Sequence, residues 1–308
     1  MEVINIENIS VLERKTIVTV GMFDGLHVGH RHLLACFMEQ SRARNLEPVV
    51  VTFDSHPRSV LFPETPMALL STCEERMRLL EDIGVPTVVL VRFTRETASL
   101  SACRFAERFL CRKLGMRTLL LGYDNSFGSK SDNDFAQLPQ LAERYGFDIV
   151  RDSAVILDGV EVSSTKIRRA LQEGNLRRAN AMLGAPYSVA GHVVHGRHIG
   201  TGIGFPTANI EPDELCKMLP AAGVYALRAT VDGAVWPAMA NLGEQPTFDG
   251  KKTVLEVNMI GFEGDIYGKK IKVDFVERIR DIQTFASADE LAARLVRDRE
   301  KVLEMLGD

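Results

Sequence analysis

The sequence of 308 residues has little excess charge and few cysteines. Lysine and arginine number 37 against 41 aspartates and glutamates, which gives a formal net charge of −4. Because proteins that bind nucleic acids usually carry a broad positive field, we expect no nucleic-acid partner. The five cysteines are an odd number without C-x-x-C spacing, which argues against a disulfide framework or a zinc site.

Long hydrophobic runs are also missing. No stretch reaches the roughly 18 apolar residues of a membrane helix. The first residues, Met1-Glu2-Val3-Ile4, have neither the positive charge nor the apolar run of a signal peptide. We therefore expect no membrane partner and a cytoplasmic location. The sequence does not set the oligomeric state, and a homo-oligomer stays open.

Two familiar nucleotide-binding motifs do not occur. There is no Walker-type G-x-x-x-x-G-K-[ST] segment. The glycines at 200, 202 and 204 have the wrong spacing for a dinucleotide fingerprint, and Phe205-Pro206 follows them instead of a helix. Neither of these two motifs therefore indicates a nucleotide site in this chain.

The chain divides into two halves with different patterns, and we place the boundary after residue 184, which gives domains of residues 1–184 and 185–308. In the first half, short apolar runs alternate with helical patterns, which predicts an α/β domain whose parallel sheet is covered on both faces. Ligands on such sheets bind beyond the carboxyl ends of the strands. The predicted strands are residues 16–20, 49–53, 87–91 and 118–121, and the predicted helices are residues 31–44, 74–83 and 103–114.

The second half contains glycine-rich β-like segments with no helical pattern between them. These segments are residues 188–194, 223–231, 253–259 and 270–275, and they predict a small antiparallel β-barrel. A helix follows, for which Ser287 and Glu290 form a predicted capping box. The apolar side chains predicted to line one face of this helix are Leu291, Leu295, Val302 and Leu306.

A glycine-rich turn with two histidines follows the first apolar strand. It reads Gly21-Met22-Phe23-Asp24-Gly25-Leu26-His27-Val28-Gly29-His30. A strand, a glycine-rich turn and a helix start together can cradle a phosphate group. His27 and His30 are spaced so that both can face one phosphate chain. Taken alone, two such histidines fit a metal site or a surface pair equally well, but directly after an apolar strand the pattern favours phosphate.

A second basic segment, residues 162–169, opens a predicted helix. Ser164 or Thr165 can cap this helix and bond phosphate oxygens, and Arg168 lies on the same side one turn later. An ordinary helix start with a solvated basic face is the alternative. The order H-x-G-H after an apolar strand resembles the nucleotidyltransferase superfamily, whose members attack the α-phosphate of ATP and release pyrophosphate.

The resemblance becomes narrower when three further segments are included. Residues 21–25, 52–57 and 122–128, with the Ser-Ser-Thr-x-Ile-Arg segment, are similar to the adenylyltransferase half of bacterial bifunctional riboflavin kinase/FAD synthetases. This implies a Rossmann-like nucleotidyltransferase domain in which the FMN phosphate attacks ATP in line, helped by positioning and charge neutralisation. It assigns His27 and His30 to stabilising charge on the ATP phosphates. The other implied nucleotide contacts are Gly21, Phe23, Asp24, Gly25, Gly29, Ser164, Thr165 and Arg168.

The same resemblance implies contacts to the flavin or the adenosine. It assigns them to His56, Pro57 and Asp124, although a plain turn role for His56 and Asp124 stays open. The alternative of a class I aminoacyl-tRNA synthetase fragment lacks support, because Lys217-Met218-Leu219-Pro220 is not a K-M-S-K-S loop.

The hexapeptide Gly204-Phe205-Pro206-Thr207-Ala208-Asn209 marks a second candidate site. In an extended segment, Thr207 and Asn209 face the same side, and their hydroxyl and amide oxygens suit a hard cation such as Mg²⁺. The hexapeptide resembles the signature of riboflavin kinases, which fold as small β-barrels. The resemblance implies that Thr207 and Asn209 contact Mg²⁺ and the ATP phosphates, with Gly204 and Pro206 beside the nucleotide.

The riboflavin kinase resemblance also implies a general base. It places Glu256 where the family has a carboxylate that activates the ribityl hydroxyl, and it places Arg280 beside the flavin. Two positions depart from the family pattern: Thr201 stands where arginine is usual, and Ile282 where an acidic residue is common. The implied activities convert riboflavin and ATP to FMN, and FMN and ATP to FAD. A flavin-binding protein without catalysis is the remaining alternative, and the presence of the assigned residues argues against it.

Overall fold

The computed structural model describes residues 1–12, 14–123, 137–195, 202, 204–247 and 250–307. The chain forms two compact units, Met1–Ser164 and Thr165–Asp308. The boundary that the sequence analysis places after residue 184 stays a prediction. Among the described residues, no helix is both long and apolar enough to span a membrane.

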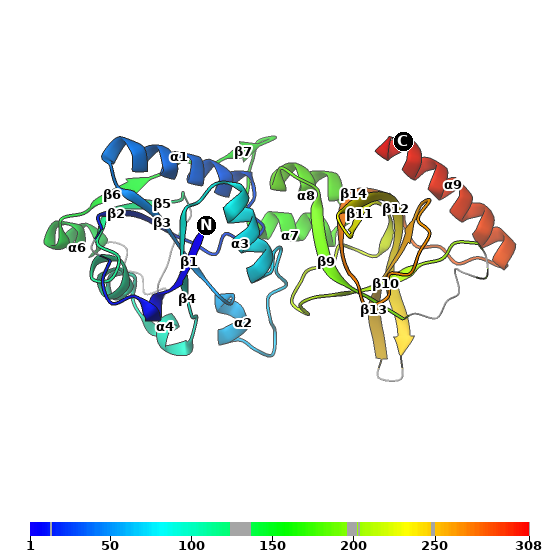
Figure 1. Cartoon of the computed structure of the whole chain (residues 1–308), viewed down its shortest axis with the longest axis horizontal. Helices are drawn as coiled ribbons and strands as arrows, with labels where there is room; N and C mark the ends of the chain where they lie inside the picture. The colour runs from blue at the N-terminus through cyan, green and yellow to red at the C-terminus, as the bar shows by residue number, and fades with distance from the viewer. Residues whose placement is uncertain (13, 124–136, 196–201, 203, 248–249, 308) are drawn as a thin grey trace. The chain divides into compact units, whose positions relative to one another are not determined.

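The first unit is built on one sheet of six parallel strands (Figure 1). In sheet order the strands are β1 (Glu2–Asn5), β4 (Thr87–Val91), β3 (Glu47–Phe53), β2 (Thr16–Val20), β5 (Met116–Leu121) and β6 (Asp148–Arg151). The four strands predicted from apolar runs are confirmed. The prediction omits β1 and β6, which have only four residues each and little burial, so neither produces an apolar run.

Helices cover both faces of this sheet. They are η1 (Ile6–Asn8), α1 (Val28–Arg44), α2 (Pro57–Leu61), α3 (Cys73–Asp82), α4 (Arg95–Ser99), α5 (Ala102–Phe105), the π-helical η2 (Ala106–Cys111) and α6 (Leu138–Tyr145). A small hairpin of β7 (Ile156–Leu157) and β8 (Val160–Glu161) follows. The predicted helix over residues 103–114 is thus an α-helical turn that continues as a π-helix.

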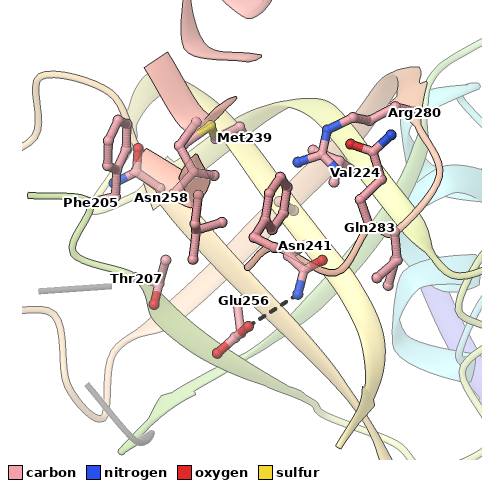
Figure 2. Close-up of a pocket in the computed structure, with 14 residues that line it drawn as sticks. Phe205, Thr207, Val224, Met239, Asn241, Glu256, Asn258, Arg280 and Gln283 are labelled. Carbon is pink, nitrogen blue, oxygen red and sulfur yellow. Dashed lines mark hydrogen bonds between the residues drawn. The ribbon is translucent and has the colours of Figure 1, made fainter. Parts of the chain in front are cut away.

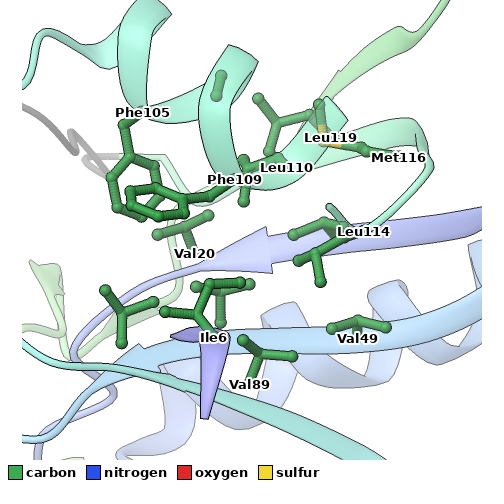
Figure 3. Close-up of a cluster of buried hydrophobic side chains, with 14 of the residues drawn as sticks. Ile6, Val20, Val49, Val89, Phe105, Phe109, Leu110, Leu114, Met116 and Leu119 are labelled. Atoms are coloured by element: carbon green, nitrogen blue, oxygen red, sulfur yellow. The ribbon is translucent and has the colours of Figure 1, made fainter. Parts of the chain in front are cut away.

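Alternation along the strands produces the two cores. On β2, Ile17 packs with α1 and α3, whereas Val18 and Val20 pack on the opposite face with Phe105 and Phe109 (Figure 3). Successive residues of a strand point to opposite faces, so an uninterrupted apolar run fills both cores. Strand order reverses between β2 and β5, and in such sheets the ligand crevice lies at the carboxyl ends of these strands.

The second unit contains a closed antiparallel barrel, as predicted. Around the barrel the strands are β10 (Ala208–Pro212), β13 (Gly250–Met259), β12 (Ala234–Thr247), β11 (Gly223–Val231), β14 (Lys270–Arg280) and β9 (Tyr187–Val194). The remaining elements are α7 (Ser164–Gln172), α8 (Leu176–Leu183) and α9 (Ala288–Leu306).

Helix α9 lies against the outer face of the barrel. Val302 and the partly buried Leu295 and Leu306 pack on Val224 and Met239 of the barrel strands, which confirms the apolar face of this helix. Its N-terminus differs in one detail from the prediction. The Glu290 N–H donates to Ser287 Oγ at 3.2 Å, but the Glu290 carboxylate accepts from the N–H of Ala286 at 3.0 Å instead of Ser287.

Candidate active sites

The loop of residues 21–30 in the first unit, called the histidine loop below, has a strained backbone. Phe23 and Leu26 have φ angles of 50° and 40°, in the left-handed region that bulky residues rarely adopt, and Gly25 has a φ of 77°. The side chains of Phe23 and Leu26 are buried against α1 in the core. Core packing therefore holds a conformation that costs about 1–3 kcal/mol per strained residue.

The Asp24 side chain connects this loop to residues 70–71. Its buried carboxylate accepts hydrogen bonds from the N–H groups of Leu70 at 3.2 Å and Ser71 at 2.8 Å, and from the Ser71 hydroxyl at 3.2 Å. Ser71 Oγ in turn accepts from the N–H of Gly25 at 2.8 Å. Ser164 donates its hydroxyl to the Asp24 carbonyl at 3.0 Å, so the structure brings this predicted phosphate ligand to the loop. The nucleotide contact expected of Asp24 stays a prediction.

His27 and His30 form a stacked pair. Their ring centroids are 3.6 Å apart with an interplanar angle of 15°. His27 caps α1, because its Nδ1 accepts from the N–H of His30 at 3.3 Å. Gly29 permits this arrangement: a Cβ atom there would lie 3.2 Å from the His27 ring, and one at Gly21 would lie 3.2 Å from the Phe23 ring.

The His30 imidazole of this stacked pair is uncharged at neutral pH. Burial lowers the pKa of His30 well below its usual value, and the charge of His27 lowers it further. The His30 Nδ1 atom is buried and has no hydrogen-bond partner. A neutral imidazole still offers one N–H donor, so His30 can donate a hydrogen bond to a phosphate oxygen without being positively charged.

The other residues predicted for the first site lie in three places. His56 caps the short helix α2, with its Nδ1 accepting from the N–H of Arg58 at 3.1 Å, and Pro57 is the first residue of that helix. This is the turn role that the sequence left open for His56. Asp124 lies outside the described residues. Thr165 and Arg168 belong to α7 of the second unit, so their approach to the histidine pair stays a prediction.

The second candidate site is a pocket of about 280 Å³ on the outer face of the barrel (Figure 2). Its walls come from the barrel strands, from the segment between β14 and α9, and from α9 itself. The lining residues are Phe205, Thr207, Val224, Met239, Ala240, Asn241, Glu256, Asn258, Arg280, Ile282, Gln283, Phe285, Leu291 and Leu295.

Polar side chains form a row across three neighbouring strands beside this pocket. Asn209 on β10 lies opposite Glu256 on β13, and Glu256 lies opposite Asn241 on β12. Residues directly opposite in antiparallel strands share a face of the sheet. Asn241 donates its amide to Glu256 Oε2 at 3.2 Å, and Thr207 lines the same pocket as Glu256 (Figure 2). The structure therefore brings together Thr207, Asn209 and Glu256, as the sequence predicts.

The Gly-Phe-Pro turn before β10 is anchored to the barrel and to α9. Gly204 has a φ of 79°, which favours glycine. Asn258 donates its amide to the Pro206 carbonyl at 2.7 Å, and the buried Phe205 ring lies 5.6 Å from the Arg299 guanidinium of α9. These contacts fix the start of the segment that carries Thr207.

Arg280 lines the pocket and is tied to α9 by a buried carboxylate. Asp298 is 1% exposed and pairs with Arg280 at 2.7 Å and with Arg294 at 3.1 Å. Ile282 forms part of the apolar wall and lies over Gly243, where a Cβ atom would come within 2.7 Å of its Cδ1. Thr201, the other departure from the family pattern, lies outside the described residues.

Two family models match the chain: FAD synthetase over residues 10–166 and riboflavin kinase over residues 183–306. The bifunctional riboflavin kinase/FMN adenylyltransferase of Escherichia coli (strain K12) is 38% identical over 292 residues, which cover 94% of this chain and 93% of the relative. The chain belongs to the bifunctional riboflavin kinase/FMN adenylyltransferase family. It is thus a transferase with a kinase and a nucleotidyltransferase domain.

Other matches extend the similarity beyond one lineage. The riboflavin kinase/FMN adenylyltransferase of Bacillus subtilis (strain 168) is 31% identical over 296 residues, covering 94% of this chain and 92% of the relative. A crystal structure from Streptococcus pneumoniae, described as a macrolide-efflux protein, has a TM-score of 0.88 at 32% identity and covers 98% of this chain and 99% of that one. That description refers to the Streptococcus pneumoniae protein and assigns no efflux function to this chain.

Motif reasoning misses several residues that support the two candidate sites. Asn258 follows Glu256 by two residues on a strand, so period-two alternation is a usable signal for it. Asp298 follows Arg294 by one helical turn, which hints at that pair but not at Arg280. Ser71 has no such signal, because its partners are distant in sequence. Asn241 lies in a segment, Asn241-Leu242-Gly243, that resembles the riboflavin kinase barrel, but nothing local indicates its hydrogen bond to Glu256.

Proposed function

We propose that the riboflavin kinase reaction takes place in the barrel pocket of the second unit and the FMN adenylyltransferase reaction at the histidine loop of the first. The observation that carries this assignment is the position of Glu256 in the pocket, beside Thr207 and in register with Asn209. A carboxylate in that position is equipped to activate a hydroxyl group next to nucleotide phosphates.

In the kinase step, Glu256 accepts the proton of the terminal ribityl hydroxyl of riboflavin. The hydroxyl oxygen then bonds to the γ-phosphorus of ATP, and the bond to the β–γ bridging oxygen breaks to release ADP. A positioned general base commonly contributes about 10²–10⁴-fold to such a step. Asn241 orients the carboxylate through its amide. The apolar part of the pocket, with Val224, Met239 and Leu295, suits a flat aromatic ring system.

The residues beside Glu256 also suit Mg²⁺. The Thr207 hydroxyl and the Asn209 amide oxygen are hard donors of the kind that Mg²⁺ takes together with substrate phosphates and water. No group of three or more His, Cys, Asp or Glu side chains able to hold a metal occurs among the described residues, so phosphate oxygens would supply the anionic ligands. The ion would neutralise phosphate charge at the transferring group.

In the adenylyltransferase step, a phosphate oxygen of FMN bonds to the α-phosphorus of ATP and pyrophosphate leaves. His27 and His30 donate hydrogen bonds to the phosphate chain, and the loop from Gly21 to Gly29 brings backbone N–H groups to it. Ser164, Thr165 and Arg168 hold the triphosphate, and residues 56–57 with Asp124 lie beside the flavin or the adenosine. No covalent enzyme intermediate forms, so catalysis rests on positioning and charge stabilisation.

We also place the enzyme in the cytoplasm, without nucleic-acid or membrane partners. All five cysteines are free thiols, which fits a reducing compartment. Burial raises the pKa of Cys111 to about 12, so this thiol is unreactive at neutral pH. Sedimentation of the purified chain with and without flavin tests the homo-oligomer that the sequence leaves open.

The decisive experiment incubates the purified protein with riboflavin, ATP and Mg²⁺ and separates the flavins by chromatography over time. FMN should accumulate first and FAD second. A parallel incubation with FMN in place of riboflavin isolates the adenylyltransferase step. FMN without FAD would restrict the function to the barrel, and unchanged riboflavin that stays bound would support a binding protein without catalysis.

A further inference from the structure

Arg76 is a fully buried cation in the first unit. Its side chain lies on α3 and is 1% exposed. The Nη2 atom donates to the carbonyl oxygen of Phe53, the last residue of β3. The Nε atom is buried without a partner, and no carboxylate of the described residues lies within 4.0 Å of the guanidinium.

Such an arrangement is unfavourable in a purely structural position. A guanidinium stays charged at any physiological pH, so it cannot lose its charge as a buried lysine can. Buried charges are normally paired, because the interior does not replace the hydration they lose. An apolar side chain of similar size would fill the same space without that cost. Arg76 therefore calls for a negative charge that the described part of the chain does not provide.

The location of Arg76 indicates where that charge comes from. Phe53 ends β3, which neighbours β2, and the histidine loop begins where β2 ends. The carboxyl ends of adjacent parallel strands lie about 4.8 Å apart. Two hydrogen bonds join the start of the histidine loop to the end of β3. The Gly21 N–H donates to the Val51 carbonyl at 3.0 Å, and Thr52 Oγ donates to the Met22 carbonyl at 3.4 Å.

Helix α3 is also connected to the histidine loop at its start. Asp24 accepts from the N–H groups of Leu70 and Ser71, directly before the helix cap at Thr72. The capping box of Thr72 and Glu75 then fixes the first turn, one residue before Arg76. These contacts fix the positive charge of Arg76 at the carboxyl end of the sheet, where the histidine loop lies.

We propose that Arg76 supplies a buried positive charge to the adenylyltransferase site, and that phosphate groups of the bound substrates are its counter-charge. This inference rests on the proposed function of the histidine loop. Because Arg76 is sealed from solvent, it acts through the field across the low-dielectric interior and does not touch the reacting atoms. It is a positioning residue. At roughly 10 Å and an effective dielectric constant near 20, one unit charge changes anion binding by about tenfold.

Two substitutions separate charge from shape. Arg76→Met removes the charge and keeps an unbranched chain, whereas Arg76→Lys keeps the charge as long as the buried ammonium group stays protonated. The matched control is Arg78→Met on the same helix, because Arg78 is exposed and pairs with Glu74. For each variant, FAD formation from supplied FMN gives separate KM values for ATP and for FMN. Riboflavin kinase activity in the same molecule reports on the unchanged second unit.

We expect Arg76→Met to raise one of the two KM values about tenfold, with kinase activity unchanged. Arg76→Lys should stay within about threefold of the wild type, as should Arg78→Met. An effect on the KM for ATP identifies the triphosphate as the counter-charge, and an effect on the KM for FMN identifies the monophosphate. Unchanged KM values in Arg76→Met would overturn the proposal, as would a loss in Arg76→Lys that equals the loss in Arg76→Met and does not shrink when the assay pH is lowered to protonate the lysine.

A binding measurement tests the charge without turnover. Inorganic pyrophosphate should raise the unfolding temperature of the wild type and of Arg76→Lys more than that of Arg76→Met. Without ligand, Arg76→Met should be as stable as the wild type or more stable, because it removes a buried charge that pairs with no carboxylate of the described residues. A variant that is less stable and responds normally to pyrophosphate would show that Arg76 only supports the fold. If the wild type makes no FAD yet pyrophosphate distinguishes the variants, the proposed function fails and the anion site stands.

Discussion

The two candidate sites are built from different parts of the backbone. The site in the first unit comes from one continuous loop with positive φ angles and a stacked pair of imidazoles, of which that of His30 is uncharged. The site in the second unit comes from three neighbouring strands whose register aligns Asn209, Glu256 and Asn241. A loop can surround a phosphate chain with N–H donors, whereas a row of strands can hold a carboxylate at a fixed distance from a hydroxyl. The loop suits the proposed adenylyltransferase reaction, which needs charge stabilisation. The row of strands suits the proposed kinase reaction, which needs a base.

The sites also differ in how a buried aspartate supports them. Asp24 accepts hydrogen bonds from backbone N–H groups and a hydroxyl, so it fixes the shape of a loop. Asp298 pairs with two arginines from β14 and α9, so it fixes a helix against a barrel. In both units a buried carboxylate therefore supports the candidate site, through hydrogen bonds in one and ion pairs in the other.

The largest separation between the two sites should come from Glu256→Gln. Without the base, FMN formation should fall by about 10²–10⁴-fold, while FAD formation from supplied FMN stays at the wild-type rate. Steady-state rates of both reactions measure the separation. Glu263→Gln, an exposed carboxylate a few residues later, is the matched control and should change neither rate. Loss of both activities in Glu256→Gln would contradict the assignment of one reaction to each unit.

The reverse separation should come from His30→Ala. Loss of an N–H donor to the phosphate chain should slow adenylyl transfer by about 10²–10³-fold and leave the kinase rate unchanged. His32→Ala, on the exposed side of the same helix, is the control. Rates with supplied FMN and with riboflavin test both halves of the expectation. Normal adenylyl transfer would remove His30 from the mechanism.

Asp298→Asn should weaken the second site through its support. Arg280 and Arg294 would lose their shared anion, and breaking a buried ion pair costs about 3 kcal/mol or more. We expect a lower unfolding midpoint and a rise in the KM for riboflavin that exceeds the fall in kcat, with adenylyl transfer unaffected. Glu304→Gln, exposed on the same helix, is the control. An unchanged KM would show that Arg280 keeps its place without Asp298.

The smallest effect concerns the pH dependence of stability in the first unit. The folded pKa of His30 lies well below 6.5, so below pH 6.5 the unfolded chain takes up a proton that the folded one does not. Stability should therefore fall with decreasing pH by roughly 1 kcal/mol per unit below pH 6.5. Urea unfolding at pH 7.5 and 5.5 measures this slope, and His30→Gln should flatten it. Equal slopes would mean that His30 gains its proton in the fold.

Elements with a strong local signal could be predicted from the sequence. β2 and β4 were predicted with their observed bounds, because a doubly covered parallel strand must be apolar on both faces. β12 was not predicted, since its Trp236-Pro237 start and its later glycine and proline give no simple alternation. It is a strand because β11 and β13 pair with it along its length. The neighbours of a strand can outweigh its own composition.

The sequence by itself determined the spacing within the two motifs, the alternation of strands and helices in one half and the barrel in the other. These follow from spacing over a few residues, which backbone geometry converts directly into a shared face or a turn. Only the tertiary structure decided that Asn241 orients Glu256, that Asp298 holds Arg280, that His30 is neutral and that Arg76 is buried with no counter-ion among the residues that the structure describes. Each of these depends on desolvation or on a partner distant in sequence, and a local pattern carries no information about either.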